Sequence, residues 1–507
     1  MRSGKLAAAL LSMSSIFMLS CSGLPRGTGG GGGGGGSSTA TLSVTLTAVP
    51  LAPPPSTNIL SFVVDINTIT LTSAAGTNVN IPLNATGLSV DLTKLQSDSA
   101  FLGTSASVPA DSYASVTLSL SNAVLTFCTQ TLGNVGCAPG SVTTISASAA
   151  ATPKITSSPF PLTLTANQQT GLAVNFNLSN ALTVSATQPQ VVTAVNLAAP
   201  NVLSASPLPS ATNSLSAGQL DFVEDVTGVV TGINAAAQSV TVKTATRGSI
   251  TAVANPSTVF SPNCTAFLLN LTFSSCIVQG QVASIDTVLK ADGTFTLLEY
   301  DPLSTTSGDW IEGIVPVSPS SSTQFTVVTN DLVPATSGSL IGASSLAGAS
   351  VNATLVNVKP FLVDSKGLTI PVNSFENNTD ASILLPGQTV SLHVTAFTAA
   401  NGTTPASVSV DTVYLRFTRI SGSVATTGTQ ASFSIQNLPS FLGMTAPLLV
   451  EVTLGAPPSV PATNFDGVTS AASLSSPQTV SIRALYFGGG TQNPSAMPFS
   501  AAKVRVP

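Results

Sequence analysis

The chain has 507 residues, of which 43% are hydrophobic, 5% are aromatic and only 7% are charged, with a formal net charge of −5 and a mean hydropathy of +0.43. The length predicts several domains, and the thin scatter of 15 basic residues argues against nucleic-acid binding. Beyond residue 20 there is no run of about 18 apolar residues, so no membrane-spanning helix is expected, and the low aromatic content disfavours an outer-membrane barrel with aromatic girdles.

The first 20 residues have the organisation of a signal peptide. A positively charged start is followed by the apolar segment 6–19, which is too short to span a bilayer comfortably. The residues that end in Cys21 resemble the lipobox of bacterial lipoproteins, although Met18 stands in place of the usual Leu and Leu19 in place of a small residue. The resemblance implies cleavage after residue 20 and attachment of lipid to Cys21. The alternative is an ordinary signal peptide whose cysteine is incidental.

Residues 21–40 are expected to form a tether between the lipid anchor and the folded body. They include an uninterrupted glycine run, Gly29 to Gly36, followed by two serines. Polyglycine loses more conformational entropy on ordering than any other sequence and offers no side chain to bury. A flexible linker of this length reaches about 25 Å, which is enough to hold a domain clear of lipid headgroups.

The five cysteines divide into one isolated residue and two close pairs. Cys21 is isolated, Cys128 and Cys137 enclose a short glycine-containing turn, and Cys264 and Cys276 span a similar distance. In an oxidising compartment both pairs are plausible disulfides, each contributing about 3 kcal/mol; buried free thiols are the alternative. Metal binding is not expected, because there is no CxxC motif and the one histidine is remote in sequence.

From residue 41 onward the hydrophobic pattern has a period of two, which is typical of half-buried strands. Gly, Pro and Asn separate the alternating segments, and no long helical period occurs. The alternating segments lie at 41–50, 59–71, 114–127, 160–166 and 170–184. Several short strands with turn signals predict an antiparallel β-sandwich over residues 41–200.

Short motifs in this region resemble a bacterial domain of unknown function, number 4382 in that naming series, which occurs in secreted lipoproteins. In that family a v-dLl-l stretch precedes a vPaG-Y turn. Here Val90-Asp91-Leu92 and the segment from Val108 to Tyr113 match these motifs, with Asp111-Ser112 in place of the usual glycine. The resemblance covers residues 41–200. It implies an exported protein and a fold rather than a chemistry, because the family has no established activity.

A segment rich in Pro, Ser and Ala follows, and because it has few large apolar residues it is predicted to be a linker. Beyond it, weak internal similarity predicts three tandem small β modules of barrel or sandwich type. Each module has a glycine two residues into its first strand (Gly228, Gly313 and Gly422), then a polar turn and a second alternating strand. This pattern resembles another small secreted domain of unknown function; one continuous sheet-rich domain is the alternative. The expected boundaries are 201–220 for the linker and 221–305, 306–417 and 418–507 for the modules.

Residues with catalytic potential are few. His393 has no GxSxG motif to accompany it and is interpreted as a partly exposed strand residue. Trp310, the only tryptophan, is interpreted as buried rather than exposed for stacking on a sugar. The acidic groups that could form a glycosidase pair, at the linker exit and at a strand end, are Asp221, Glu224, Asp225, Glu299 and Asp301. No catalytic residue, cofactor or metal site is predicted from these groups.

The expected protein is all-β, an N-terminal sandwich followed by three small modules, and it is non-enzymatic, with a structural, adhesive or scaffold role. Its expected partners are the membrane, through lipidated Cys21, and an envelope polysaccharide or protein. Ser22 rather than Asp follows the cysteine, which favours outer-membrane delivery in a cell with two membranes; the periplasmic or surface face is left open. An envelope module that binds polysaccharide or peptide is the alternative, and a hydrolase is a third hypothesis.

Overall fold

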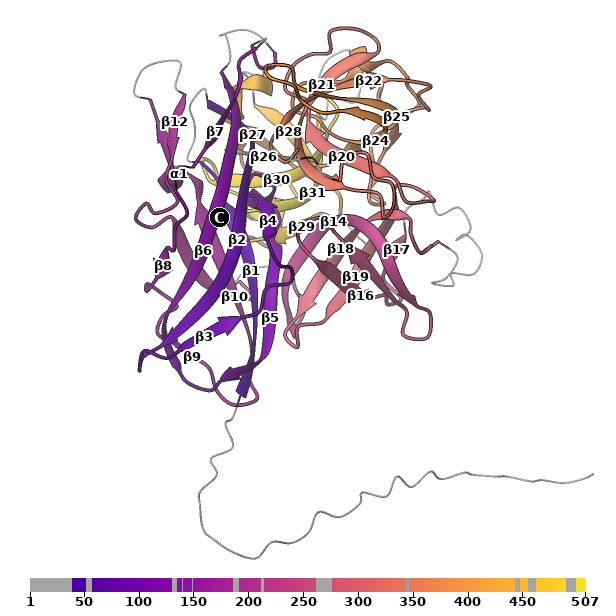
Figure 1. Ribbon diagram of the computed structural model, residues 1–507. Coiled ribbons are helices and arrows are strands. Elements are labelled where there is room, and N and C mark those ends of the chain that lie inside the picture. Colours follow the sequence, from indigo (N-terminus) through magenta and orange to yellow (C-terminus); the bar gives the residue numbers. More distant parts are fainter. Residues whose placement is uncertain are drawn as a thin grey trace, which may run out of the picture. The chain divides into compact units, whose positions relative to one another are not determined.

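The computed structural model describes residues 39–507 except 52–56, 130–134, 139, 148, 186–190, 211–213, 261–275, 343, 345, 443–446, 455–461 and 489–497. The predicted signal peptide, and the predicted tether up to residue 38, lie outside the described residues. Strands dominate the part that is described, as expected for an all-β chain (Figure 1). None of its helices is both long enough and apolar enough to cross a membrane.

The N-terminal region is a β-sandwich of two sheets, with strand orders β13-β10-β1-β5 and β3-β2-β6-β7; the long strands β2 and β6 lie side by side in Figure 1. The first sheet contains β1 (Thr39–Val49), β5 (Ala100–Pro109), β10 (Gln169–Asn177) and β13 (Leu203–Leu208). The second contains β2 (Thr57–Ser73), β3 (Asn78–Ile81), β6 (Ser112–Thr129) and β7 (Val142–Ser146), with β4 (Leu88–Asp91), β8 (Lys154–Ile155) and β9 (Leu162–Thr163) at its margins.

The core of the sandwich follows from the alternation in the sequence. In β1 the side chains of Leu42, Val44 and Leu46 all point inward and are buried. Phe62 of β2 meets Phe176 of β10 edge to face, with ring centroids 5.8 Å apart, and thereby joins the two sheets. One pairing departs from the predicted antiparallel arrangement, because β1 and β10 run parallel.

Two expectations for the sandwich are corrected. Segment 170–184 is not one strand: β10 ends at Asn177, whose side chain accepts a hydrogen bond from the backbone N–H of Asn180 and caps the helical turn α1 (Leu178–Ala181). After this turn β11 (Leu182–Val184) pairs with β12 (Val192–Val195). The linker expected at 201–220 is wrong in part, because β13 pairs with β10 and buries the alternating residues Leu203 and Ala205.

The turn that matches the family motif closes without the usual glycine. The Tyr113 hydroxyl donates to the carbonyl oxygen of Pro109 at 2.8 Å, and the backbone N–H of Ser112 donates to Asp111 Oδ1 at 2.7 Å. No residue between 109 and 113 has a positive φ, so the backbone of this turn does not need the conformational freedom of glycine.

Three six-stranded sheets follow the sandwich, and we name them modules 1, 2 and 3. Module 1 contains β14 (Gln219–Asn234), β15 (Ser239–Lys243), β16 (Ser249–Val253), β17 (Val259–Phe260), β18 (Val282–Lys290) and β19 (Phe295–Pro302). Module 2 contains β20 (Asp309–Ile314), β21 (Gln324–Val333), β22 (Ser350–Leu355), β23 (Leu362–Val363), β24 (Thr389–Thr398) and β25 (Ala406–Arg416). Module 3 contains β26 (Thr418–Thr426), β27 (Ser432–Gln436), β28 (Leu448–Val452), β29 (Asn464–Asp466), β30 (Thr479–Tyr486) and β31 (Phe499–Arg505).

The three modules share one topology. In module 1 the order is β16-β15-β14-β18-β19-β17, and a parallel pairing of β16 with β19 closes five of the strands into a barrel. Modules 2 and 3 repeat this order, and the parallel pairs β22–β25 and β28–β31 close them in the same way. A five-stranded barrel with this strand order is the architecture of an OB-fold.

The repeated glycine of the modules has a steric cause. A Cβ on Gly228, Gly313 or Gly422 would overlap a backbone carbonyl oxygen of the second strand of its own module, belonging to Lys243, Val328 and Gln436 respectively. The first and second strands thus approach too closely for any side chain at this position. The glycine recurs in all three modules because each module brings its first and second strands together in the same way.

We expect Gly228→Ala to lower the free energy of unfolding by about 2 kcal/mol or more, because the new methyl group forces β14 and β15 apart. Gly232→Ala, four residues further along β14, is the matched control. Its Cβ would approach only the side chain of Thr241, at 3.3 Å, so a loss within about 1 kcal/mol is expected. Chemical denaturation measures both, and equal losses would refute the steric explanation.

Candidate functional site: a buried charge network

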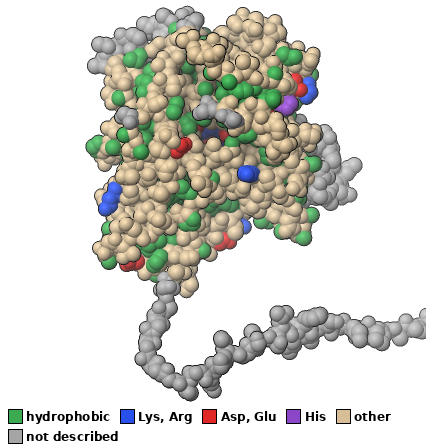
Figure 2. Space-filling model, in the orientation of Figure 1, with side chains coloured by type: hydrophobic (Ala, Val, Ile, Leu, Met, Phe, Trp, Pro, Cys, Tyr) green, Lys and Arg blue, Asp and Glu red, His purple; other side chains and the backbone are tan. Residues whose placement is uncertain are grey.

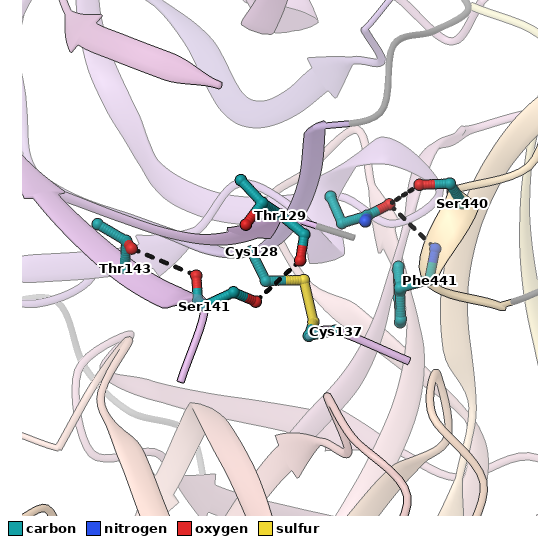
Figure 3. Close-up of a disulfide and its surroundings, with 8 residues drawn as sticks. Cys128, Thr129, Cys137, Ser141, Thr143, Ser440 and Phe441 are labelled. Carbon is teal, nitrogen blue, oxygen red and sulfur yellow. Dashed lines mark hydrogen bonds between the residues drawn. A yellow bond between two sulfur atoms is a disulfide. The ribbon is translucent and has the colours of Figure 1, made fainter. Parts of the chain in front are cut away.

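Of the predicted cysteine sites, Cys21 and Cys264 lie outside the described residues. Cys128 and Cys137, one of the two predicted pairs, form a disulfide with both cysteines buried (Figure 3). Cys276 lies half-buried against the core of module 1.

The disulfide lies where the sandwich meets modules 2 and 3. Next to it, the backbone N–H of Gly136 donates to the carbonyl oxygen of Phe441 at 2.6 Å, and that of Cys137 donates to the carbonyl oxygen of Pro316 at 2.8 Å. The two cysteine side chains belong to the same hydrophobic cluster as residues of module 3, Phe441 among them. The disulfide therefore constrains a loop whose backbone is hydrogen-bonded to both modules.

The side chain of His393 on β24 is 29% exposed, as interpreted from the sequence, and its Nδ1 lies 2.6 Å from Asp411 Oδ1. Its ring packs against Trp310, with ring centroids 5.2 Å apart. Trp310 is 3% exposed and also packs against Tyr414. Because Trp310 is buried, it offers no platform on which a sugar ring could stack.

The five acidic candidates lie near the start of one strand and near the end of another, as predicted, and all five are buried. Asp221, Glu224 and Asp225 belong to β14, and Glu299 and Asp301 belong to β19. Thr45 of the sandwich donates to Asp221 at 2.8 Å. Burial raises the pKa of Asp221, although Arg505 and Lys503 oppose this. The other four candidates take part in ion pairs.

Ion pairs among buried and half-buried side chains connect the sandwich with all three modules, and we call these side chains the charge network. Its acidic members are Asp98 of the sandwich, Glu224, Asp225, Asp286, Glu299 and Asp301 of module 1, and Glu312, Asp331 and Asp364 of module 2. Its basic members are Lys94 of the sandwich, Arg247 of module 1, Lys366 and Arg416 of module 2, and Arg419, Arg483 and Lys503 of module 3. On the face drawn in Figure 2, charged side chains are correspondingly sparse.

A β-bulge gives two consecutive carboxylates different partners. The register of β14 against β18 shifts between Val223 and Val226, and Asp225 has a φ of 53°. Glu224 is paired with two cations of module 3, lying 2.7 Å from Lys503 and 3.1 Å from Arg483. Asp225 is instead paired with cations of the sandwich and of modules 2 and 3.

Asp225 is paired with one cation from the sandwich and one from each of modules 2 and 3. The distances are 3.3 Å to Lys94, 2.5 Å to Arg416 and 2.6 Å to Arg419. Burial alone would raise the pKa of Asp225, but Arg419, Lys94 and Arg416 together hold this pKa well below its usual range. A single ionised carboxylate therefore links all four structural units.

The charges are distributed according to the internal repeat. The segments "GQVASID", "GQTVSLH" and "PQTVSIR" place Asp286, His393 and Arg483 at equivalent positions of the fifth strand of modules 1, 2 and 3, namely β18, β24 and β30. Asp286 and Arg483 pair with each other at 2.6 Å. The same barrel face is therefore acidic in module 1 and basic in module 3, and the two faces meet.

Reasoning from the sequence missed this network, although a signal for it exists. Basic residues interrupt alternating apolar strands in "VYLRFTRI", "VSIRALYF" and "AAKVRVP". Arg416 and Arg483 each have a large apolar residue two positions away on the same strand face, Tyr414 and Leu485. A cation on such a face, if buried, needs a partner that neutralises it. Comparing the repeats position by position would have shown that acids of module 1 and cations of module 3 occupy equivalent positions, as Asp286 and Arg483 do.

Residues 39–192 match the family model described as "Domain of unknown function (DUF4382)". No curated protein and no solved structure matches the chain.

Proposed function

We propose that this chain, which carries an N-terminal domain of the DUF4382 family over residues 39–192, is a lipid-anchored, non-enzymatic protein of the bacterial cell envelope with a structural or scaffold role. Cys21 is the proposed anchor, and the glycine-rich segment after it is the proposed spacer. Because Ser22 follows the cysteine, the outer membrane is the proposed destination.

The charge network is the observation that carries the scaffold proposal. Glycoside hydrolysis needs two carboxylates that reach a substrate, yet Glu224, Asp225, Glu299 and Asp301 are each less than 10% exposed. Their nearest charged partners include cations from other structural units. Because these charges pair between structural units, they fix the sandwich and the modules in one arrangement. A rigid arrangement of this kind suits a structural or scaffold protein better than an enzyme that turns over a substrate.

The anchor is tested by metabolic labelling with an alkyne fatty acid. We expect the wild-type chain to take up the label and to fractionate with membranes, and Cys21→Ala to lose nearly all of both, because only the Cys21 sulfur offers the proposed lipid attachment site. Ser22→Ala changes the neighbouring residue without removing a thiol, so it should label as the wild type does. Label that persists in Cys21→Ala would exclude the anchor.

A further inference from the structure

Three carboxylates converge at the contact between modules 1 and 2. Glu299 and Asp301 are two residues apart on β19 and so project from the same face of the strand. Asp364 directly follows β23, and its backbone N–H donates to the carbonyl oxygen of Leu415 at 3.0 Å. One oxygen from each carboxylate lies within 4.8 Å of the others. Two calcium–oxygen bonds of about 2.4 Å span that separation.

These carboxylates have oxygens without hydrogen-bond partners among the described residues. The oxygens are Glu299 Oε1, Asp301 Oδ1 and Oδ2, and Asp364 Oδ1. All three side chains are more than 90% buried. An ionised carboxylate in such a place costs several kcal/mol unless something satisfies it.

The neighbouring cations already have other partners. Arg416 Nη1 donates to the second oxygen of Asp364 and leaves Oδ1 unpaired. Lys366 Nζ donates to Asp286 Oδ1 at 3.0 Å and lies near Ser284 Oγ at 3.4 Å. It lies 3.6 Å from Glu299 and 3.7 Å from Asp301, too far for a hydrogen bond to either.

The charge network has fewer basic than acidic members. If all nine of its carboxylates are ionised, as they would be around a bound cation, its seven basic members leave two negative charges without a counterpart. Among the described residues, the buried carboxylate oxygens without a hydrogen-bond partner all belong to Glu299, Asp301 and Asp364. One divalent cation at this point would neutralise that excess and give one oxygen of each of the three carboxylates a partner.

We propose that Glu299, Asp301 and Asp364 form a buried calcium site that joins modules 1 and 2. The ligands on offer are carboxylate oxygens, which suit a hard cation. Calcium fits better than magnesium, because magnesium demands a near-ideal octahedron at about 2.0–2.1 Å and keeps several waters. The inference is independent of the proposed anchoring and scaffold role.

The test uses the full-length chain, stripped with EDTA and then dialysed against CaCl₂ or calcium-free buffer. We expect about one calcium ion per chain by mass spectrometry of the metal content, and a rise in melting temperature of about 3 °C in 1 mM CaCl₂ over EDTA. Asp301→Asn is nearly isosteric and should bind less than about a tenth of an ion per chain, with no calcium-dependent shift in melting temperature.

Asp221→Asn is the matched control, because Asp221 is a buried carboxyl of the same module that lies outside the three-carboxylate site. It should bind calcium as the wild type does. A folded wild-type chain that holds no calcium and melts at the same temperature in CaCl₂ and EDTA would overturn the proposal without reference to any variant. Calcium retained in full by Asp301→Asn would overturn the assignment of the ligands.

Discussion

Replacing Arg416 with methionine is expected to lower the free energy of unfolding by about 3–5 kcal/mol. The Arg416 side chain is 1% exposed and pairs with Asp225 at 2.5 Å, with Glu312 at 3.1 Å and with Asp364. Methionine keeps much of the apolar stem and removes the charge. Three buried carboxylates thereby lose a cation in a network that is already short of positive charge, and denaturant titration of the full chain measures the loss.

Lys359→Met is the matched control for this variant, since it removes a cation of the same module that is also paired with a carboxylate. The Lys359 side chain is 64% exposed and lies 3.2 Å from Asp411, so a loss below about 1 kcal/mol is expected. Adding Asp364→Asn to Arg416→Met should recover part of the larger loss, because one unpaired charge disappears. If Arg416→Met cost no more than Lys359→Met, the network would not stabilise the assembly.

In EDTA, the stability of the wild-type chain should contain a component that falls as the pH rises from about 4 to 7, and Asp301→Asn should lack this component. Burial, and after it the neighbouring Asp364 carboxylate, raises the pKa of Asp301 to about 7, against the effect of Lys366. The unfolded chain releases that proton near pH 3.9. Between these values the folded state binds more protons, so its stability decreases with rising pH.

The variant and the wild type should therefore differ little below about pH 4, and above pH 7 the variant should be more stable by up to about 4 kcal/mol. Burial and the Asp301 carboxylate also raise the pKa of Glu299 well above its usual range, so the component belongs to the Glu299–Asp301 pair. Glu376→Gln, at an exposed carboxyl of module 2, is the control and should keep the wild-type profile. Parallel profiles for Asp301→Asn and the wild type would contradict the assignment.

The strands could be predicted from the sequence where burial is local and alternating. The alternation of Leu42, Val44 and Leu46 with polar residues predicts β1. The glycine repeated at positions 228, 313 and 422 indicates the first strand of each module. Prediction failed where a strand is short and polar, as in β13, whose sequence "LSASPL" has the composition of a linker. The position of β13 in the sheet depends on its pairing with β10. The local sequence pattern of β13 contains no information about this pairing.

The charge network could not be predicted because its pairs are distant in sequence. Arg416 lies 191 residues from Asp225, and Lys94 lies 218 residues from Glu312. Acidic clusters such as "DFVEDV" look like solvated loop ends when their partners are unknown. Only the packing of four units shows that these charges are buried and paired.

The meeting of an acidic and a basic barrel face also sets an order of events during biosynthesis. Glu224 is translated 279 residues before Lys503, its closest cationic partner. Until β31 is available, the acidic face of module 1 has to remain hydrated, since burying it without its cations would be strongly unfavourable. Final docking of module 1 therefore requires module 3, and a chain interrupted within module 3 would leave the acidic surface of module 1 exposed.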